Sequence, residues 1–253
     1  MPCRKECLVI MKISILTLFP EMFDAVLNQS ILKRARDKGL YDIEIINIRD
    51  FSKDKYHHVD DTPYGGGAGM LLQIEPIDLA LQSVRSDNSF VLLTSPKAKP
   101  FNQLKAREYA NKEHIVIVCG HYEGFDARVE TLVDDRLSIG DFILTGGELA
   151  AMVVVDSVVR LLNDAISKDS LDVESFDNNL LEYPQYTKPP VYKGMKVPDV
   201  LLSGHHKNIQ RYRLKEALKD TLRYRSDLLK NHEFTKEEIE LLKEIRDELK
   251  NTK

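Results

Sequence analysis

The sequence predicts an α/β fold with a mostly parallel sheet, followed by a small helical domain. Short apolar segments alternate with helical patterns from Met11 to about residue 165, which is the arrangement of consecutive βα units. The amino-acid composition then becomes polar and acidic from residue 163, and several prolines follow. Two long helical patterns come last, over residues 209–230 and 237–249.

Composition places the chain among ordinary globular proteins. Of its 253 residues, 43% are hydrophobic and 30% are charged, which excludes disorder throughout. A net charge of −4 excludes a uniformly basic nucleic-acid coat but permits a local basic patch. No segment reaches the about 18 apolar residues of a membrane span, and the N-terminal apolar run is too short for a signal peptide. Three cysteines without a paired framework indicate a reducing compartment, so we expect a cytoplasmic protein.

The strands and helices of the α/β part alternate regularly. Each expected strand is a short apolar run or an apolar–polar alternation bounded by turn residues. The strands are expected over residues 12–18, 41–48, 90–93, 115–119 and 142–144. Pro20 is suited to the first turn of the first helix, and Gly39 is expected to stop it. The other helices are expected over residues 75–84, 103–111, 126–133 and 148–162.

Changes in amino-acid composition and hydrophobic pattern divide the sequence into four parts. Met11 opens the first strand, so residues 1–10 are expected to form an N-terminal extension outside the fold. Residues 11–165 are the expected α/β domain, and residues 166–182 are the expected mobile linker. Residues 183–253 are then expected to form the helical domain.

Three glycine-rich segments are the first candidates for ligand binding. They span residues 64–69, 118–126 and 138–148. The last two accompany expected strand ends, and in open α/β sheets ligands bind beyond the carboxyl ends of strands. Glycines there let the backbone approach a ligand closely, so we expect a nucleotide-like ligand. The alternatives are a flexible surface loop at residues 64–69 and tight connections at the other two.

Charged residues around the linker are the next candidates. A carboxylate beside a bound base could act as a general base, and Arg160 could hold a developing anion. The alternatives are a solvated linker and a cation at a helix end. The linker carboxylates are Asp169, Asp172, Glu174 and Asp177.

The last helices carry a local excess of positive charge. Residues 204–230 contain eight lysines and arginines against three acids, with histidines and tyrosines between them. This pattern favours contact with nucleic-acid phosphates over its alternative, a solvated basic face. Thr235 and Glu238 have the spacing of a capping box at the start of the final helix. The apolar face of that helix is expected to comprise Ile239, Leu242, Ile245 and Leu249.

Metal and hydrolase chemistry find little support in the sequence. His57–His58 and His205–His206 are adjacent pairs, and there is no Cys-x-x-Cys or His-Glu-x-x-His motif, so we expect no metal site. No Gly-x-Ser-x-Gly elbow supports a serine hydrolase. No dinucleotide fingerprint supports a Rossmann-type oxidoreductase.

A series of long motifs runs through both parts of the chain. They are LFPEMF (18–23), VDDTPYGGGAGM (59–70), VCGHYEGFDARV (118–129), SIGDFILTGGELAAM (138–152), DSVVR (156–160), ESFDNNLLEYPQYTKPPVYKGMKVPDVLLSGHH (174–206) and IQRYRLKEAL (209–218). In this order they resemble the bacterial tRNA (guanine-37-N1)-methyltransferase family, from Met11 to about the last helix. The resemblance implies the SPOUT fold, a parallel α/β sheet with a deep trefoil knot. Chain physics alone argues against a knot, because threaded chains are rare.

The resemblance also implies an activity and partners. The enzyme would transfer a methyl group from S-adenosylmethionine to N1 of guanine at position 37 of tRNA, beside the anticodon. It would act as a homodimer with active sites shared between subunits, and it would need Mg²⁺, for which no ligand cluster in the sequence identifies a site. The alternatives are a SPOUT methyltransferase acting on ribosomal RNA or a ribose hydroxyl, and a non-catalytic RNA-binding relative.

Individual residues acquire implied roles from the same resemblance. Arg160 matches an essential arginine, and Glu174 matches the catalytic aspartate, in a triplet that here reads Glu-Ser-Phe. Asp172 or Asp177 could stand in for Glu174, and His121 lies where an arginine is common. The residues implied to hold or border the methyl donor are Leu93, Gly120, Tyr122, Ile139, Gly140, Asp141, Phe142, Ile143, Leu144, Gly146 and Gly147.

Overall fold

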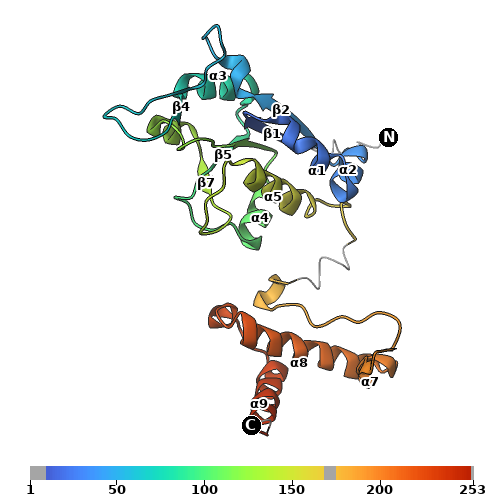
Figure 1. The fold of residues 1–253 in the computed structure, drawn as a ribbon. Helices are drawn as coiled ribbons and strands as arrows, with labels where there is room; N and C mark the ends of the chain where they lie inside the picture. Colours follow the sequence, from blue (N-terminus) through green and yellow to red (C-terminus); the bar gives the residue numbers. More distant parts are fainter. Residues whose placement is uncertain (1–9, 168–174, 252–253) are drawn as a thin grey trace. The chain divides into compact units, whose positions relative to one another are not determined.

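The computed structural model describes residues 10–167 and 175–251. The chain divides into two compact units, Met1–Ser167 and Lys168–Lys253 (Figure 1). Among the described residues, the first unit has two buried hydrophobic clusters and the second has one.

The first unit is built on a five-stranded parallel sheet. In chain order its strands are β1 (Met11–Thr17), β2 (Tyr41–Asn47), β5 (Ser89–Thr94), β6 (His114–Val118) and β7 (Asp135–Leu137). Their order in the sheet is β2-β1-β6-β5-β7, and every neighbouring pair is parallel. The predicted parallel α/β architecture is therefore confirmed, and the carboxyl ends of β5, β6 and β7 lie at one edge.

Helices connect the strands of this sheet. In chain order they are η1 (Pro20–Phe23), α1 (Asp24–Leu27), α2 (Ser30–Asp37), η2 (Ile48–Phe51), α3 (Ile74–Val84), α4 (Gln103–Ala110), η3 (Ala127–Leu132) and α5 (Glu148–Val159). A short antiparallel pair, β3 (Asp60–Asp61) and β4 (Leu71–Leu72), precedes α3. The helix expected after Pro20 is divided into three pieces, and Ser30 adopts a φ of 48° where the last piece begins.

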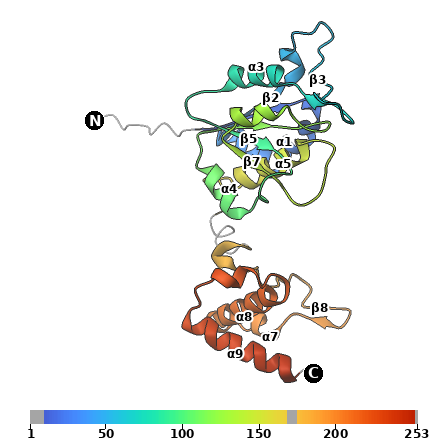
Figure 2. The same ribbon diagram turned by 90° about the vertical axis from the view of Figure 1, so that its left-hand side faces the viewer.

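Helices cover both faces of the sheet (Figures 1 and 2). On one face, Ile13 and Ile15 of β1 belong to a buried cluster with Val154 of α5. On the other face, Leu16 belongs to a cluster with Leu81 of α3. Because successive side chains of a strand point to opposite faces, one apolar strand supplies both layers.

One predicted strand of the sheet is wrong. The apolar run at residues 142–144 lies in a loop, where Phe142 and Ile143 are 53% and 82% exposed. The edge strand is β7 instead, which pairs with β5 through Leu92↔Asp135 and Leu93↔Arg136. Its charged side chains give no hydrophobic pattern in the sequence. The strand joins the sheet through backbone pairing and not through burial of apolar side chains.

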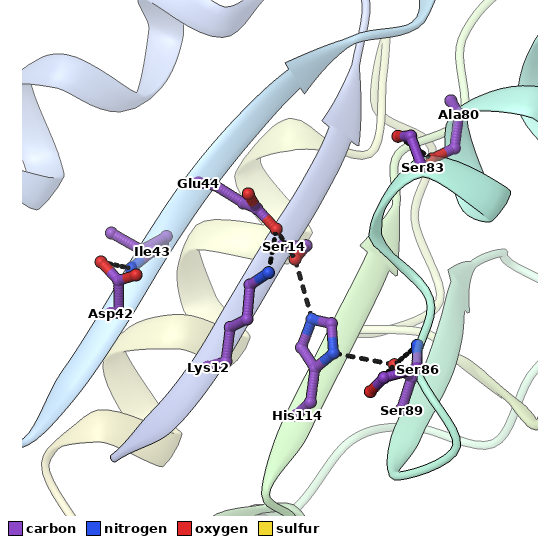
Figure 3. A network of polar contacts seen from close by, with 10 residues as sticks. All are labelled: Lys12, Ser14, Asp42, Ile43, Glu44, Ala80, Ser83, Ser86, Ser89 and His114. Carbon is purple, nitrogen blue, oxygen red and sulfur yellow. Dashed lines mark hydrogen bonds and ion pairs between the residues drawn. The ribbon is translucent and has the colours of Figure 1, made fainter.

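A polar network links the first residues of β5 and β6 to the middle of β1 and β2 (Figure 3). The Ser14 hydroxyl donates to Glu44 Oε1 at 2.6 Å and lies 2.8 Å from His114 Nε2. His114 Nδ1 lies 2.8 Å from Ser89 Oγ, and Lys12 forms an ion pair with Glu44 at 2.7 Å. A neutral His114 ring that carries its proton on Nε2 satisfies every bond of this network. Burial, followed by the charge of Lys12, lowers the pKa of His114.

The second unit is mainly helical. Its elements are η4 (Asp177–Asn179), the antiparallel pair β8 (Val191–Tyr192) and β9 (Met195–Lys196), α7 (Asp199–Leu202), α8 (His206–Tyr224), η5 (Leu228–Asn231) and α9 (Lys236–Asn251). The helix predicted over residues 209–230 therefore begins earlier and ends at Tyr224. Leu218 of α8 packs with Leu241 and Ile245 of α9 in the core of this unit.

The start of α9 confirms the predicted capping box. Thr235 Oγ1 accepts a bond from the Glu238 N–H at 3.2 Å, and Glu238 Oε2 accepts one from the Thr235 N–H at 2.7 Å. The predicted apolar face of the helix is partly wrong, since Leu241 is buried whereas Ile239 is 45% exposed. The buried stripe includes positions 238, 241 and 245, so the face is rotated relative to the expected one.

Candidate active site

The loops that follow β5, β6 and β7 enclose a cavity of about 250 Å³ at the carboxyl edge of the sheet. The structure brings to its wall all of the implied donor-site residues except Leu93 and Asp141. Those on the wall are Gly120, Tyr122, Ile139, Gly140, Phe142, Ile143, Leu144, Gly146 and Gly147. Leu93 is 2% exposed and belongs to the core beneath α3, and Asp141 is exposed.

Sequence reasoning missed one side of this cavity. Thr94, Ser95 and Pro96, which follow β5, also line it, whereas Glu123 and Ser138 lie within the predicted segments 118–126 and 138–148. The signal for the first three residues was present, because they come directly after the predicted strand at 90–93. The rule that ligands bind beyond strand ends applies to that strand as much as to its neighbours.

Close backbone contacts hold the start of α5 against the cavity loops. The Gly147 N–H donates to the Gly120 carbonyl at 2.8 Å, and the Gly120 N–H donates to Thr94 Oγ1 at 3.0 Å. Thr94 Oγ1 donates in turn to the Val118 carbonyl at 3.2 Å. A Cβ on Gly147 would lie 2.1 Å from Thr94 Oγ1 and 2.8 Å from the Gly120 nitrogen, so this crossing admits only glycine.

An apolar loop forms another part of the wall. Gly140 has a φ of +148°, and a Cβ there would lie 2.5 Å from the Phe142 ring. The Ser138 hydroxyl closes the turn by donating to the Gly140 carbonyl at 3.0 Å. The exposed side chains of Phe142 and Ile143 therefore belong to an ordered loop, and their apolar surface suits the flat face of a ligand ring.

The glycine-rich segment 64–69 is tied to the cavity at one end only. After it, the Glu123 N–H donates to the Met70 carbonyl at 3.0 Å, and the Glu123 side chain packs over Gly69. Gly65 and Gly66 have positive φ and open space around their Cα atoms. The segment is not part of the cavity wall, although its last glycine contacts a wall residue.

The two implied catalytic residues do not lie at this cavity as the structure describes it. Arg160 directly follows the last residue of α5, whose first turn lies at the cavity. The twelve residues of α5 span about 18 Å, so Arg160 is roughly one helix length away within the same chain. Glu174 and the alternative Asp172 lie outside the described residues, as does Asp169.

Part of the predicted basic patch is neutralised within the second unit. Lys215 forms ion pairs with Glu244 at 3.0 Å and with Glu248 at 2.7 Å, and Arg211 pairs with Glu244. These pairs join α8 to α9. Some of the cations of α8 therefore form ion pairs within their own unit. The excess of lysine and arginine counted from the sequence overstates the positive charge available to a partner.

A second cavity of about 540 Å³ lies wholly within the second unit. Tyr183, Tyr186, Lys188 and Arg213 are on its wall, and the Arg213 guanidinium lies 4.8 Å from the centre of the Tyr183 ring. Aromatic rings and cations in one cleft are typical of surfaces that hold unpaired nucleobases. It is larger than the cavity in the first unit, but no glycine is among the described residues of its wall, and the strands next to it are the short antiparallel pair β8 and β9.

Comparisons with known proteins identify the family. A family model described as "tRNA (Guanine-1)-methyltransferase TrmD" matches residues 11–231. The chain belongs to this family. It is 54% identical over 234 residues to a tRNA (guanine-N(1)-)-methyltransferase of Carboxydothermus hydrogenoformans, covering 92% of each chain. It is 52% identical over 241 residues to one of Dictyoglomus turgidum, covering 95% of this chain and 98% of the other.

The family match begins at the residue where β1 begins, and it extends into the second unit but ends before α9. It therefore includes the cavity of the first unit and helix α8. Among the helices that the structure describes, none is long and apolar enough to cross a membrane. Within the described part of the chain, no three His, Cys, Asp or Glu side chains are grouped so that they could hold a metal ion.

Proposed function

We propose that this protein transfers a methyl group from S-adenosylmethionine to N1 of guanine at position 37 of tRNA, next to the anticodon. The observation that carries the proposal is 52–54% identity over more than nine-tenths of the chain to tRNA (guanine-N(1)-)-methyltransferases. A glycine-lined cavity at the carboxyl edge of a parallel sheet supports it independently. The tRNA substrate and the unpaired, buried Cys119 fit a cytoplasmic location.

The donor cavity fits S-adenosylmethionine by its chemistry. Gly140, Gly146 and Gly147 bring main chain to its wall, where side chains on the last two would collide with Glu148 and Thr94. Main-chain donors and acceptors can hold the polar edges of an adenosine, and the loop at 142–144 can cover its ring. When bound, the donor supplies a methyl group that is electrophilic because it is carried on a sulfonium.

The rate of such a methyl transfer is limited by the nucleophile, guanine N1. Guanine N1 bears a proton, so a base must remove it before the lone pair can attack, and negative charge then spreads onto O6. We assign proton removal to Glu174 and stabilisation of the O6 charge to Arg160. A positioned general base contributes typically about 10²- to 10⁴-fold. The target base must leave its stack to reach the site, which costs less in a single-stranded loop.

We also propose a homodimer with shared sites, and the position of Arg160 supports it. Within one chain this residue lies about 18 Å from the cavity, at the far end of α5. In the proposed dimer, a second copy would deliver its Arg160 to the donor site, so that both act on one base. Coexpressed Gly147→Ala and Arg160→Ala subunits should recover activity that each variant alone lacks, because a mixed dimer has one intact pair. No recovery would exclude a shared site.

We further propose the deep trefoil knot of the SPOUT fold. The segment between β7 and α5 returns across the sheet edge, and Gly146 bridges His121 in the loop after β6. Gly147 then passes between Thr94 and Gly120, while Pro100 pairs with Ser138. These contacts place the segment against two earlier loops, as a threaded chain requires.

The second part of the chain would bind tRNA. Residues 183–253 would form the tRNA-binding domain, and residues 166–182 would be the linker that closes over the target base. The cleft with Tyr183, Lys188 and Arg213 supports contact with unpaired nucleotides. Cations of α8 that do not pair with α9, such as Lys207, would contact stem phosphates.

The deciding experiment is methyl transfer from labelled S-adenosylmethionine to tRNA transcripts that carry guanine or adenine at position 37. We expect incorporation only into the guanine transcript, and N1-methylguanine after digestion. Equal labelling of both transcripts, or preferential labelling of ribosomal RNA, would favour a different RNA target. Adding a chelator to the same assay tests the implied need for Mg²⁺, which should appear as lost turnover.

A further inference from the structure

A buried carboxylate lies directly behind the wall of the donor cavity. Glu148 is the first residue of α5 and is only 2% exposed. Its Oε1 accepts a hydrogen bond from Thr17 Oγ1 at 2.8 Å. Its Oε2 faces Gly146, where an added Cβ would lie 2.2 Å from this oxygen. Because Gly146 itself lines the cavity, one glycine separates the carboxylate from the ligand space.

The charge of Glu148 has no cationic partner among the residues that the structure describes. Its hydrogen bond is to a neutral hydroxyl, and the His121 ring, on the same side of Gly146, has a buried Nδ1 without a hydrogen-bond partner. The amino end of α5, where the helix dipole is positive, and the Thr17 hydroxyl both lie beside this carboxylate. A buried anion that no cation compensates projects its field into the adjoining space more strongly than a solvated one.

The charge of Glu148 also acts on the neighbouring thiol of Cys119. Burial raises the pKa of Cys119 well above its usual value, and the charge of Glu148 adds to that rise. The Cys119 Cα lies against Gly147, another cavity residue. The titratable groups that face Glu148 are thus Cys119 and His121, and the rings beside His121 are Phe19 and Tyr122.

We propose that Glu148 makes the donor cavity select the positively charged methyl donor over its neutral thioether product. The inference rests on the proposed function. S-adenosylmethionine and S-adenosylhomocysteine differ by one methyl group and one positive charge, so contacts with adenine and ribose cannot separate them. An anion behind Gly146 attracts the sulfonium and leaves the thioether unaffected. Transfer of the methyl removes the positive charge from sulfur, which weakens this attraction and favours exchange of product for fresh donor.

The test compares three ligands by isothermal titration calorimetry on the full-length protein. S-adenosylmethionine and sinefungin both carry a positive charge at the position of the donor sulfur, the second on an amine, whereas S-adenosylhomocysteine has a neutral thioether there. In Glu148→Gln, we expect about tenfold weaker binding of the two cationic ligands and less than twofold change for S-adenosylhomocysteine. The matched control is Thr17→Val, which removes the hydrogen bond but keeps the charge, and its affinity ratios should stay within about twofold of wild type.

A merely structural role for Glu148 predicts a different result. All three affinities would then fall by the same factor in Glu148→Gln, and Thr17→Val would reproduce part of that fall; either result overturns the proposal. Should Glu148→Gln fail to fold, His121→Arg is the second variant, since it puts a permanent cation beside the carboxylate. It should lower the donor-to-product affinity ratio several-fold, and an unchanged ratio would overturn the proposal. Absence of donor binding to the wild-type protein would instead refute the proposed function.

Discussion

At the carboxyl edge of the sheet, close contacts of single atoms determine which residue type a backbone position accepts. Gly147 contacts Thr94 and Gly120 so closely that no side chain fits between them. Its φ of −84° is ordinary, so the requirement for glycine is steric and not conformational. Gly39 is the opposite case, with a φ of +70° and no neighbouring atom within 4 Å.

This contrast gives a prediction for Gly147→Ala. The added methyl must push Thr94 or Gly120 aside, which should destabilise the first unit by about 1–3 kcal/mol and weaken donor binding at least tenfold. Calorimetry and thermal unfolding measure both effects. Gly39→Ala is the control, because it strains the backbone by about 1 kcal/mol far from the cavity and should leave donor affinity unchanged. Equal donor affinity in the two variants would refute the role of the Gly147 contact.

The proposed base gives a second prediction at this scale. Glu174→Gln should reduce methyl transfer at least 10²-fold while donor affinity persists, because the amide cannot accept the N1 proton. Glu174→Asp should remain active, since it restores the residue that the family usually has. Single-turnover rates on guanine-37 tRNA measure both. Near-normal turnover of Glu174→Gln would transfer the role to Asp172 or Asp177.

At the scale of elements, the sequence predicts what apolar burial determines. β1 and β6 are buried on both faces, and their runs of isoleucine and valine identify them directly. β7 is held by backbone pairing at an edge, so its Asp135 and Arg136 give no apolar signal. The run at 142–144 is apolar because it borders a cavity, which a strand pattern cannot distinguish from a core. The glycines of the predicted segments 118–126 and 138–148 are found at that cavity, whereas those of 64–69 are not, and the Thr94 side of the cavity went unrecognised.

The network around His114 joins four strands and makes stability depend on pH (Figure 3). Burial lowers the pKa of His114 in the folded state, so below about pH 6.5 the unfolded chain binds a proton that the folded chain does not. Stability should therefore fall as the pH drops from 7.5 to 5, by at most about 1.4 kcal/mol per pH unit for this one group.

Urea unfolding of wild type and His114→Gln over this pH range measures the effect. The variant should lose stability at pH 7.5 but should lack the part of the pH slope that His114 causes. Glu44 does not interfere, because its pKa is already lowered: burial alone would raise it, but hydrogen bonds from Lys12 and Ser14 outweigh burial. Its contribution is lost only at more acidic pH. Identical slopes for the two proteins would refute the assignment to His114.

At the scale of the whole molecule, the two units depend on cores of very different size. The sheet of the first unit separates two large clusters, whereas the second unit has a core of Leu218, Leu241 and Ile245 with a few partly buried leucines. The ion pairs of α8 with α9 add little, because exposed pairs contribute about 0–1 kcal/mol each. The second unit should therefore unfold before the first unit when one of its core side chains is truncated.

Leu241→Ala tests this separation in the full-length protein. Leu241 is fully buried, so the truncation should cost about 2–5 kcal/mol and unfold the second unit first. Hydrogen exchange should rise across α8 and α9 while the strands of the sheet stay protected. Donor affinity should stay within about twofold, since the cavity lies in the first unit, and methyl transfer to tRNA should be lost. Leu222→Ala, at a position that is 39% exposed, is the matched control and should retain both functions. Loss of donor binding in Leu241→Ala would mean that the first unit requires the second to form its cavity.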